Sequence, residues 1–148
     1  MEIVYFDMDN VLVNFQSGIE KLQTIDLINY EGKLDEVPGI FGLMEPNEGA
    51  IEAFHMISRF YDCYILSTAP WENDTAWSDK IKWVKKYLGE VAYKRLILSH
   101  NKNLNIGHYL IDDRTTNGAG EFTGEHIHFG YGDYKNWDDV VNYLLNEK

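Results

Sequence analysis

Cysteine and positive charge are both scarce in this chain, and each shortage excludes a class of protein. The 148 residues include one cysteine, Cys63, so no disulfide can form within the chain, and no Cys/His cluster suggests a zinc site. Thirteen Lys and Arg residues against 24 Asp and Glu residues give a formal net charge of -11. Because binding to the backbone of a nucleic-acid polymer needs clustered cations, this balance argues against such a partner.

A long hydrophobic run is also lacking. No apolar segment reaches the roughly 18 residues that span a bilayer. Residues 1–7 contain no basic segment of the kind that opens a signal peptide. We therefore expect a cytoplasmic protein that does not enter a membrane. Hydrophobic residues make up 45% of the chain, which is too many for a disordered protein, and its length suits one domain.

Short apolar segments alternate with amphipathic ones. Their β-branched and aromatic content predicts strands at residues 2–6, 63–66, 96–98, 109–111 and 126–129. Alternating strands and helices predict an α/β fold, in which a parallel sheet carries helices on both faces.

Helical spacing of apolar residues predicts three regular helices, over about 50–61, 77–88 and 137–145. Asn47 is the expected N-cap of the first, and Asn136 or Asp138 that of the last. In the middle helix, one apolar face is expected to contain Trp77, Ile81, Val84 and Leu88.

One segment interrupts this alternation. Residues 11–30 are typical of one or two short helices, and residues 32–49 are rich in glycine and proline and predict a loop. We expect a single domain over residues 1–148. Within it, the segment of about residues 15–46 should form a small cap above the carboxyl ends of the strands.

Charged and hydroxyl side chains follow four of the predicted strands. In chain order they are Asp7, Asp9, Ser67, Thr68, Lys102, Asp112 and Asp113. The carboxyl ends of parallel strands meet at one edge of a sheet, where open α/β proteins bind ligands. Four carboxylates there would repel one another without a cation, and Mg²⁺ prefers oxygen ligands. The lysine and one of the hydroxyls would then suit a phosphate dianion.

The order of these groups resembles the four motifs of the haloacid dehalogenase (HAD) superfamily of phosphohydrolases. The matching segments are Asp7-Met8-Asp9-Asn10-Val11, Leu66-Ser67-Thr68, Lys102 and Ile111-Asp112-Asp113. A single Asp-x-Asp would be a weak signal in so acidic a chain, but four motifs in order are specific. The resemblance implies a Rossmann-like, HAD-like core with a small helical cap inserted after the first strand.

A closer resemblance is to the 5'(3')-deoxyribonucleotidase family of the cytosolic type C. It is carried by residues 6–15, 67–70 and 110–114, and by a lysine ten positions before the acidic pair. Two aromatic residues, Phe15 and Phe41, also stand at family positions. The segment between the first two motifs is shorter than in mammalian members, so the cap that shapes the base pocket is reduced.

The resemblance implies Mg²⁺-dependent hydrolysis of phosphomonoesters, with (deoxy)nucleoside monophosphates as the expected substrates. Asp7 would attack phosphorus and form an aspartyl-phosphate, while Asp9 would act as general acid and then as general base. Thr68, with Ser67 as the alternative, would donate a hydrogen bond to the phosphoryl group. Lys102 would balance the phosphoryl charge.

The resemblance also implies how metal and substrate are held. The metal ligands would be Asp7, the backbone carbonyl of Asp9, and Asp112 and Asp113. Phe15 and Phe41 would stack on the base, with core packing as the alternative role of each aromatic ring.

Other functions fit parts of the same pattern. A sugar phosphate or another small phosphomonoester is the alternative substrate, because the cap is reduced. A phosphoacceptor module or a non-catalytic phosphate- and metal-binding protein is the alternative of another class. The open site also suggests a homo-oligomer, in which a second copy supplies missing walls.

Overall fold

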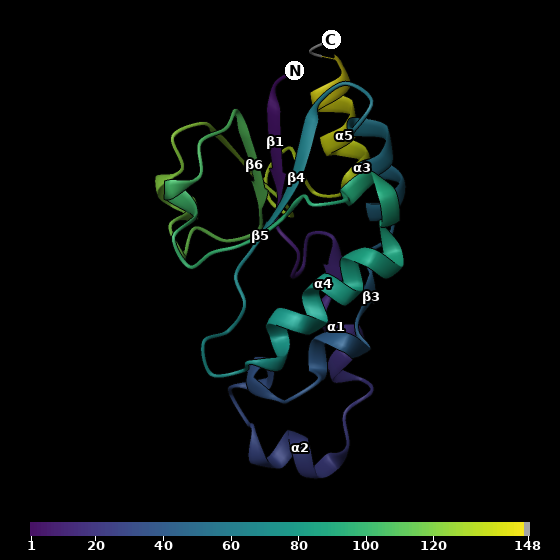
Figure 1. The fold of residues 1–148 in the computed structure, drawn as a ribbon, viewed down its shortest axis with the longest axis vertical. Helices are drawn as coiled ribbons and strands as arrows, with labels where there is room; N and C mark the ends of the chain where they lie inside the picture. Colours follow the sequence, from purple (N-terminus) through teal and green to yellow (C-terminus); the bar gives the residue numbers. More distant parts are fainter. Residues whose placement is uncertain (147–148) are drawn as a thin grey trace.

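The computed structural model describes residues 1–146, and a five-stranded parallel sheet forms its centre (Figure 1). The sheet order is β5-β4-β1-β6-β7. The strands are β1 (Ile3–Phe6), β4 (Asp62–Ser67), β5 (Leu96–Leu98), β6 (Tyr109–Asp112) and β7 (Glu125–His128). All five predicted strands are therefore confirmed. The strands that follow β1 in the chain are added first on one side of it, as β4 and β5, and then on the other side, as β6 and β7. Ligands bind in such sheets at the carboxyl end of the strand where this direction changes, which here is β1.

The register of the central strands brings their polar ends together. Phe6 in β1 pairs with Ile65 in β4 and with Ile111 in β6. The next residues along these strands include Asp7 and Asp112. The side chains predicted for the site therefore emerge from adjacent strands at almost the same level.

Three α-helices contribute to the larger core, which contains Val4 and Phe6 of β1. They are α3 (Ala50–Ile57), α4 (Thr75–Tyr87) and α5 (Trp137–Asn146). In Figure 1, α3 and α5 lie side by side, while α4 extends from the sheet towards the lower part of the molecule. The short helix η3 (Gly89–Ala92) follows α4 and leads into β5.

A smaller apolar cluster lies on the other face of the sheet. It contains Tyr5, Leu66 and Leu110, packed with Phe122 and with the 3-10 helix η5 (Ala119–Glu121). The predicted fold class is confirmed, since helices flank a parallel sheet. The second cluster, however, is packed with a 3-10 helix and loops.

Residues 15–44 form an insertion that leaves and rejoins the rest of the chain through a two-stranded antiparallel ribbon. Its strands are β2 (Val13–Asn14) and β3 (Glu45–Pro46). The insertion contains α1 (Phe15–Ile19), α2 (Thr24–Asn29), η1 (Leu34–Glu36) and η2 (Ile40–Leu43). The two short helices expected before residue 30 are present, whereas the predicted loop after it contains 3-10 helices.

Two details of the helix predictions are wrong. Gly49, with φ of 79°, precedes α3 as its N-cap, because the side chain of Asn47 instead donates a hydrogen bond to the backbone oxygen of Val11. In α4, Ile81 is 42% exposed, and Lys80 takes a fully buried position beside it. The cap of α5 is Asn136, whose Oδ1 accepts a hydrogen bond from the backbone N–H of Asp139 (2.9 Å).

The helices within residues 1–146 are all too short or too polar to cross a membrane.

The core analysis predicts a large loss of stability for Phe54→Ala. Phe54 is fully buried, and its ring centroid lies 4.7 Å from that of Phe6. Removing this ring should lower the free energy of unfolding by about 3–5 kcal/mol, measured by urea denaturation. Phe60→Ala, at a site that is 47% exposed, is the matched control and should cost about 1 kcal/mol or less. Equal losses in the two variants would contradict this description of the core.

Candidate active site

A cavity of about 300 Å³ opens where the central strands end. Residues that follow β1, β4, β5 and β6 line it, among them Asp7, Thr68, Lys102 and Asp112. The helix η1 of the insertion contributes another part of the wall. The volume is at the lower end of the range for small-molecule sites.

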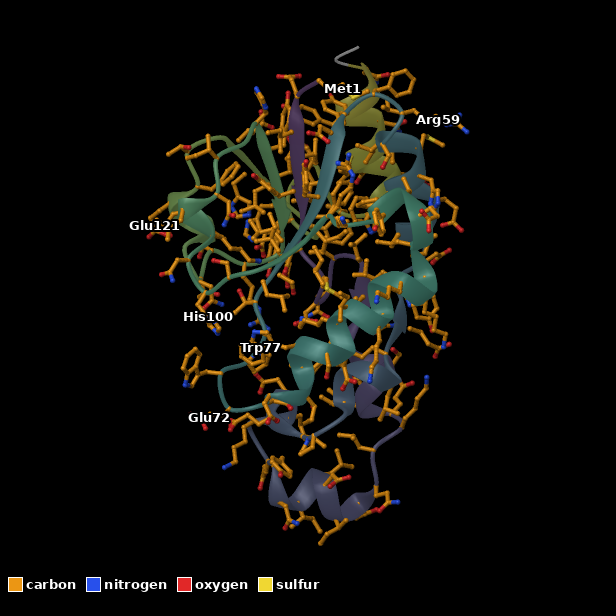
Figure 2. The ribbon with its side chains drawn as sticks, in the orientation of Figure 1. Met1, Arg59, Glu72, Trp77, His100 and Glu121 are labelled. Atoms are coloured by element: carbon orange, nitrogen blue, oxygen red, sulfur yellow. The ribbon has the colours of Figure 1, made fainter. Side chains whose placement is uncertain are left out.

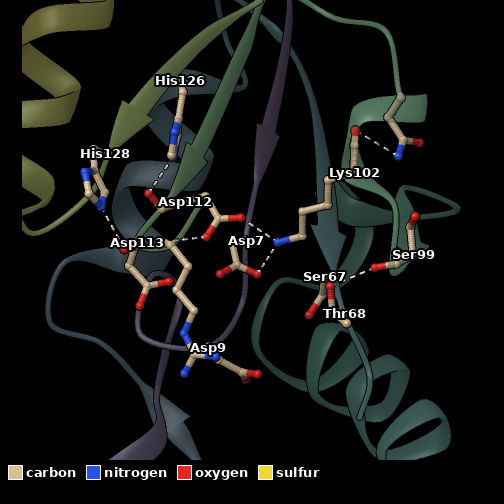
Figure 3. Close-up of polar contacts among 12 residues, drawn as sticks. Asp7, Asp9, Ser67, Thr68, Ser99, Lys102, Asp112, Asp113, His126 and His128 are labelled. Carbon is tan, nitrogen blue, oxygen red and sulfur yellow. Dashed lines mark hydrogen bonds and ion pairs between the residues drawn. The ribbon is translucent and has the colours of Figure 1, made fainter. Parts of the chain in front are cut away.

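Lys102 lines the cavity, and its ammonium contacts both Asp7 and Asp112 (Figure 3). Its Nζ lies 3.0 Å from Oδ1 of Asp7 and 2.6 Å from Oδ2 of Asp112, and all three side chains are buried. Burial lowers the pKa of Lys102, but the two carboxylates raise it further, so the pKa lies above its ordinary value. Lys102 is therefore a charged ammonium group that forms an ion pair with each of the two carboxylates.

The two carboxylates paired with Lys102 form a cluster with a third, that of Asp113. Asp7, Asp112 and Asp113 each offer an oxygen, and these oxygens lie within 4.8 Å of one another. Burial, and after it the charge of Asp7, raises the pKa of both Asp112 and Asp113. Oδ1 of Asp113 is buried and has no hydrogen-bond partner among residues 1–146. An uncompensated negative charge and an orphaned buried oxygen both fit an oxygen-liganded divalent cation.

Two histidines on β7 hold the backbone of the acidic pair. Nε2 of His126 lies 3.0 Å from the backbone oxygen of Asp112, and Nε2 of His128 lies 2.9 Å from that of Asp113. Because a carbonyl oxygen only accepts, each ring donates its N–H there. The backbone N–H of Arg114 also donates to Oδ1 of Asp112 (3.0 Å). These bonds fix the backbone that carries the acidic pair.

A second lysine, which sequence reasoning missed, lies beside Asp9. Nζ of Lys80 in α4 lies 3.2 and 3.1 Å from the two carboxylate oxygens of Asp9 and donates to Oγ of Ser67 (2.9 Å). Burial raises the pKa of Asp9, and the ammonium of Lys80 opposes that rise. The sequence did contain a signal, because Lys80 recurs at helical spacing with two buried residues of α4, Ala76 and Val84.

The two candidate hydroxyls have different partners. Oγ1 of Thr68 donates to the backbone oxygen of Ser99 (2.7 Å), and Thr68 lines the cavity. Oγ of Ser67 is buried and accepts a hydrogen bond from Lys80, so its own hydrogen is free to be donated elsewhere.

The structure does not bring Phe15 and Phe41 to the cavity with the other predicted site residues. Their rings contact each other edge to face at 5.9 Å, and neither is among the residues that line the cavity. Phe41 is only 3% exposed, and Nζ of Lys80 lies 4.4 Å from its ring centroid. Phe41 therefore packs in the core and stabilises the buried ammonium of Lys80.

Comparisons with known proteins agree with this geometry. The model of a family described as 5' nucleotidase, deoxy (pyrimidine), cytosolic type C protein matches residues 33–143. The chain is 63% identical over 145 residues to a putative 5'(3')-deoxyribonucleotidase of Vibrio phage KVP40, covering 98% of the chain and 85% of that relative. It is 28% identical over 157 residues to the human 5'(3')-deoxyribonucleotidase, cytosolic type, covering 85% and 78% respectively. A putative 5'(3')-deoxyribonucleotidase of Bordetella bronchiseptica is 28% identical over 176 residues, covering 94% and 95%.

The position of Lys80 predicts that its removal destabilises the protein. Lys80→Met keeps most of the unbranched stem of the side chain but leaves Asp9 and Ser67 without their shared donor. We expect a loss of about 1–3 kcal/mol in the free energy of unfolding, measured by denaturant titration. Lys82→Met, at an exposed position of the same helix, should change it by less than about 0.5 kcal/mol. If Lys80→Met were as stable as Lys82→Met, the ion pair would contribute nothing to folding.

Proposed function

The chain belongs to the family of 5' nucleotidase, deoxy (pyrimidine), cytosolic type C proteins, and from this premise we propose that it removes the phosphate group from (deoxy)nucleoside monophosphates. One observation carries the proposal. Asp7 lies buried at the floor of a cavity, between the ammonium of Lys102 and two further carboxylates. A nucleophilic carboxylate, a cation and a metal-binding cluster in one place are what phosphomonoester hydrolysis by this chemistry requires.

Asp7 is the proposed nucleophile. Its carboxylate oxygen attacks phosphorus, a P–O bond to Asp7 forms, and the P–O bond to the nucleoside oxygen breaks. The resulting aspartyl-phosphate is then hydrolysed by water, which releases inorganic phosphate and restores the carboxylate. The ion pair with Lys102 supports this role, because it orients the Asp7 carboxylate and would place a positive charge beside the phosphoryl oxygens of a bound substrate.

Asp9 is the proposed general acid and base. It gives a proton to the leaving nucleoside oxygen in the first step and takes one from the attacking water in the second. Lys80 contacts both of its carboxylate oxygens and fixes the group close to Asp7. Burial, which favours the protonated form, and Lys80, which favours the ionised form, act on the same carboxyl group. These opposing effects suit a residue that must both release and accept a proton.

Thr68 is the proposed hydroxyl donor to the phosphoryl group, because it lines the cavity. Its hydroxyl donates to the backbone oxygen of Ser99 in this structure and would turn towards a bound phosphoryl group. Ser67 is the alternative, since its hydrogen is not committed, but its side chain is fully buried and is not among the residues that line the cavity. Lys102 supplies the charged donor to the same group.

The resident metal is proposed to be Mg²⁺. The carboxylates of Asp7, Asp112 and Asp113, with the backbone carbonyl of Asp9, would hold it. When bound, the ion neutralises the charge of the carboxylates and of the phosphoryl group. The hydrogen bonds from His126 and His128 keep two of these ligands in place.

Residues 15–46 are proposed to be the cap of the site. The segment returns through the β2–β3 ribbon, and η1 within it forms part of the cavity wall. We also infer a cytoplasmic location, in keeping with the word cytosolic in the name of the human relative.

The nucleophile assignment predicts that Asp7→Asn abolishes turnover. The amide cannot attack phosphorus, so phosphate release from dUMP or dTMP should fall by about three orders of magnitude or more. Folding should be retained, as checked by circular dichroism. Asp133→Asn, which changes an exposed acid, is the matched control and should keep full activity. Substantial turnover by Asp7→Asn would show that another group attacks phosphorus.

The metal assignment predicts that Mg²⁺ raises the temperature of unfolding. A ligand that binds only the folded state stabilises the protein, and the stabilisation grows as the ligand concentration rises above Kd. Asp113→Asn should weaken this effect by about tenfold or more in apparent Kd, while Asp133→Asn should leave it unchanged. The readout is thermal unfolding at increasing Mg²⁺ concentrations, with chelator as the zero point. A Mg²⁺ response that is identical in all three proteins would place the metal elsewhere.

A further inference from the structure

A buried asparagine joins the insertion to the loop between β4 and α4. Asn73 is only 2% exposed, although its side chain is an amide with two N–H donors and an acceptor oxygen. Burying such a group is unfavourable unless the protein itself supplies its hydrogen-bond partners. In Figure 2, the labelled Glu72 and Trp77, on either side of Asn73 in the sequence, lie between the sheet and the insertion.

Both N–H groups of this amide are used by the insertion. Nδ2 of Asn73 donates to the backbone oxygens of Asp35 (3.0 Å) and Val37 (3.1 Å). Since a carbonyl oxygen only accepts, the nitrogen of the amide must be the atom that faces these two groups. Asp35 belongs to η1, and Val37 directly follows that helix. Asn73 therefore holds this segment of the insertion by its backbone.

Thr75 extends the contact by two further hydrogen bonds. Its Oγ1 donates to Oδ1 of Asn73 (2.6 Å) and accepts from the backbone N–H of Gly39 (2.9 Å). The φ of Gly39 is 84°, in the left-handed region that glycine adopts at little cost. Three backbone groups of residues 35–39 are thus bound by two side chains that are close in the sequence. We refer to Asn73 and Thr75 as the clamp.

The clamp connects two walls of the cavity. Asp35 and Glu36 line the cavity from the insertion, while Thr68 and Trp71 line it from the loop that leads to the clamp. The two clamp residues are not themselves among the lining residues. A wall that is held by buried hydrogen bonds is preorganised, so a ligand does not have to order it on binding.

We propose that Asn73 and Thr75 are positioning residues, which hold the insertion side of the cavity as a fixed wall for the nucleoside part of the substrate. The inference rests on the proposed function, which places the phosphate of the substrate beside Asp7 and Lys102. Because the clamp acts through the wall, its loss should weaken the binding of a nucleotide. The chemical step and the binding of phosphate alone should stay as they are.

The positioning role is tested by comparing KM for dUMP with the Ki of inorganic phosphate as a competitive inhibitor. Asn73→Asp turns an acceptor oxygen towards the two backbone carbonyls, and Thr75→Val removes the hydroxyl at nearly constant shape. In each variant KM should rise about tenfold, while kcat stays within about twofold of the wild type. The Ki of phosphate should not change, since phosphate needs only the site beside Lys102. Thr75→Ser, which keeps the hydroxyl, should restore the wild-type KM.

Asn142→Asp is the matched control for Asn73→Asp, because it makes the same chemical change at an exposed position of α5. It should keep the wild-type KM for dUMP. Equal rises in KM for dUMP and in the Ki of phosphate would show a general loss of structure at the site and would overturn the positioning role.

Hydrogen exchange tests the clamp without any turnover. The backbone N–H of Gly39 donates to Thr75 Oγ1, so it exchanges with solvent when this bond opens. In the wild type without ligand, exchange should be about a hundredfold or more slower than that of an unstructured amide. Thr75→Val should remove most of this protection, and Thr75→Ser should keep it. Exchange of the Gly39 amide at the unstructured rate in the wild type would show a wall that opens freely, and would overturn the inference.

The failures of this inference and of the proposed function are distinguishable. A wild-type KM for dUMP in both Asn73→Asp and Thr75→Val would overturn the positioning role and leave the proposed phosphatase intact. Phosphate release from neither dUMP nor dTMP by the wild type in the presence of Mg²⁺ would refute the proposed function, and the role of the wall in binding a nucleotide with it.

Discussion

The ammonium of Lys102, buried between Asp7 and Asp112, is the interaction on which the site depends. Burying charges is costly unless they are paired, so this lysine must be held close to both carboxylates. The backbone N–H of Lys102 donates to the backbone oxygen of Asn117 (2.8 Å) and thereby docks η4 (Lys102–Leu104) on the following loop. A Cβ at Gly118 would come within 2.8 Å of that same nitrogen, and Gly118 has a φ of 82°. Only glycine allows both this conformation and this approach, so a backbone contact outside the cavity positions the charge inside it.

Lys80 has a corresponding role between the sheet and the insertion. It is part of α4, and from there it reaches Asp9 behind β1 and Ser67 at the end of β4. The same helix contacts the insertion, where Nε1 of Trp83 donates to the backbone oxygen of Met44 (3.1 Å). One helix therefore places both the ammonium and the insertion relative to the strand ends. A shift of α4 would change the position of the proposed acid and base together with the shape of the cavity.

The sequence predicted the strands and the polar side chains at their ends, because two signals agreed there. The first signal was the apolar runs, which marked the strands. The second was the polar residues at the strand ends, such as Asp7 and Asp112, because carboxylates at the end of a buried strand are typical of a ligand site. Lys80 was missed because apolar periodicity treats a charged residue as exposed, whereas its burial depends on partners that are far away in the sequence. The cap of α3 was missed for a similar reason. Asn47 has the chemistry of a cap, but its side chain has a tertiary partner, the backbone oxygen of Val11, and Gly49 takes the position instead. Phe41 illustrates the same limit, since a family position alone does not reveal that a lysine covers its ring.

The net charge of -11 restricts where an anionic substrate can bind on this protein. The field of the whole molecule repels a phosphate, and Asp35, Glu36 and Glu72, which line the cavity, add to that repulsion. The floor differs from its surroundings because low-dielectric burial strengthens the local field of Lys102 and of a divalent ion beside it. In the proposed function, the phosphate group of a nucleotide would therefore be attracted to this floor alone, where Lys102 and Asp7 lie side by side.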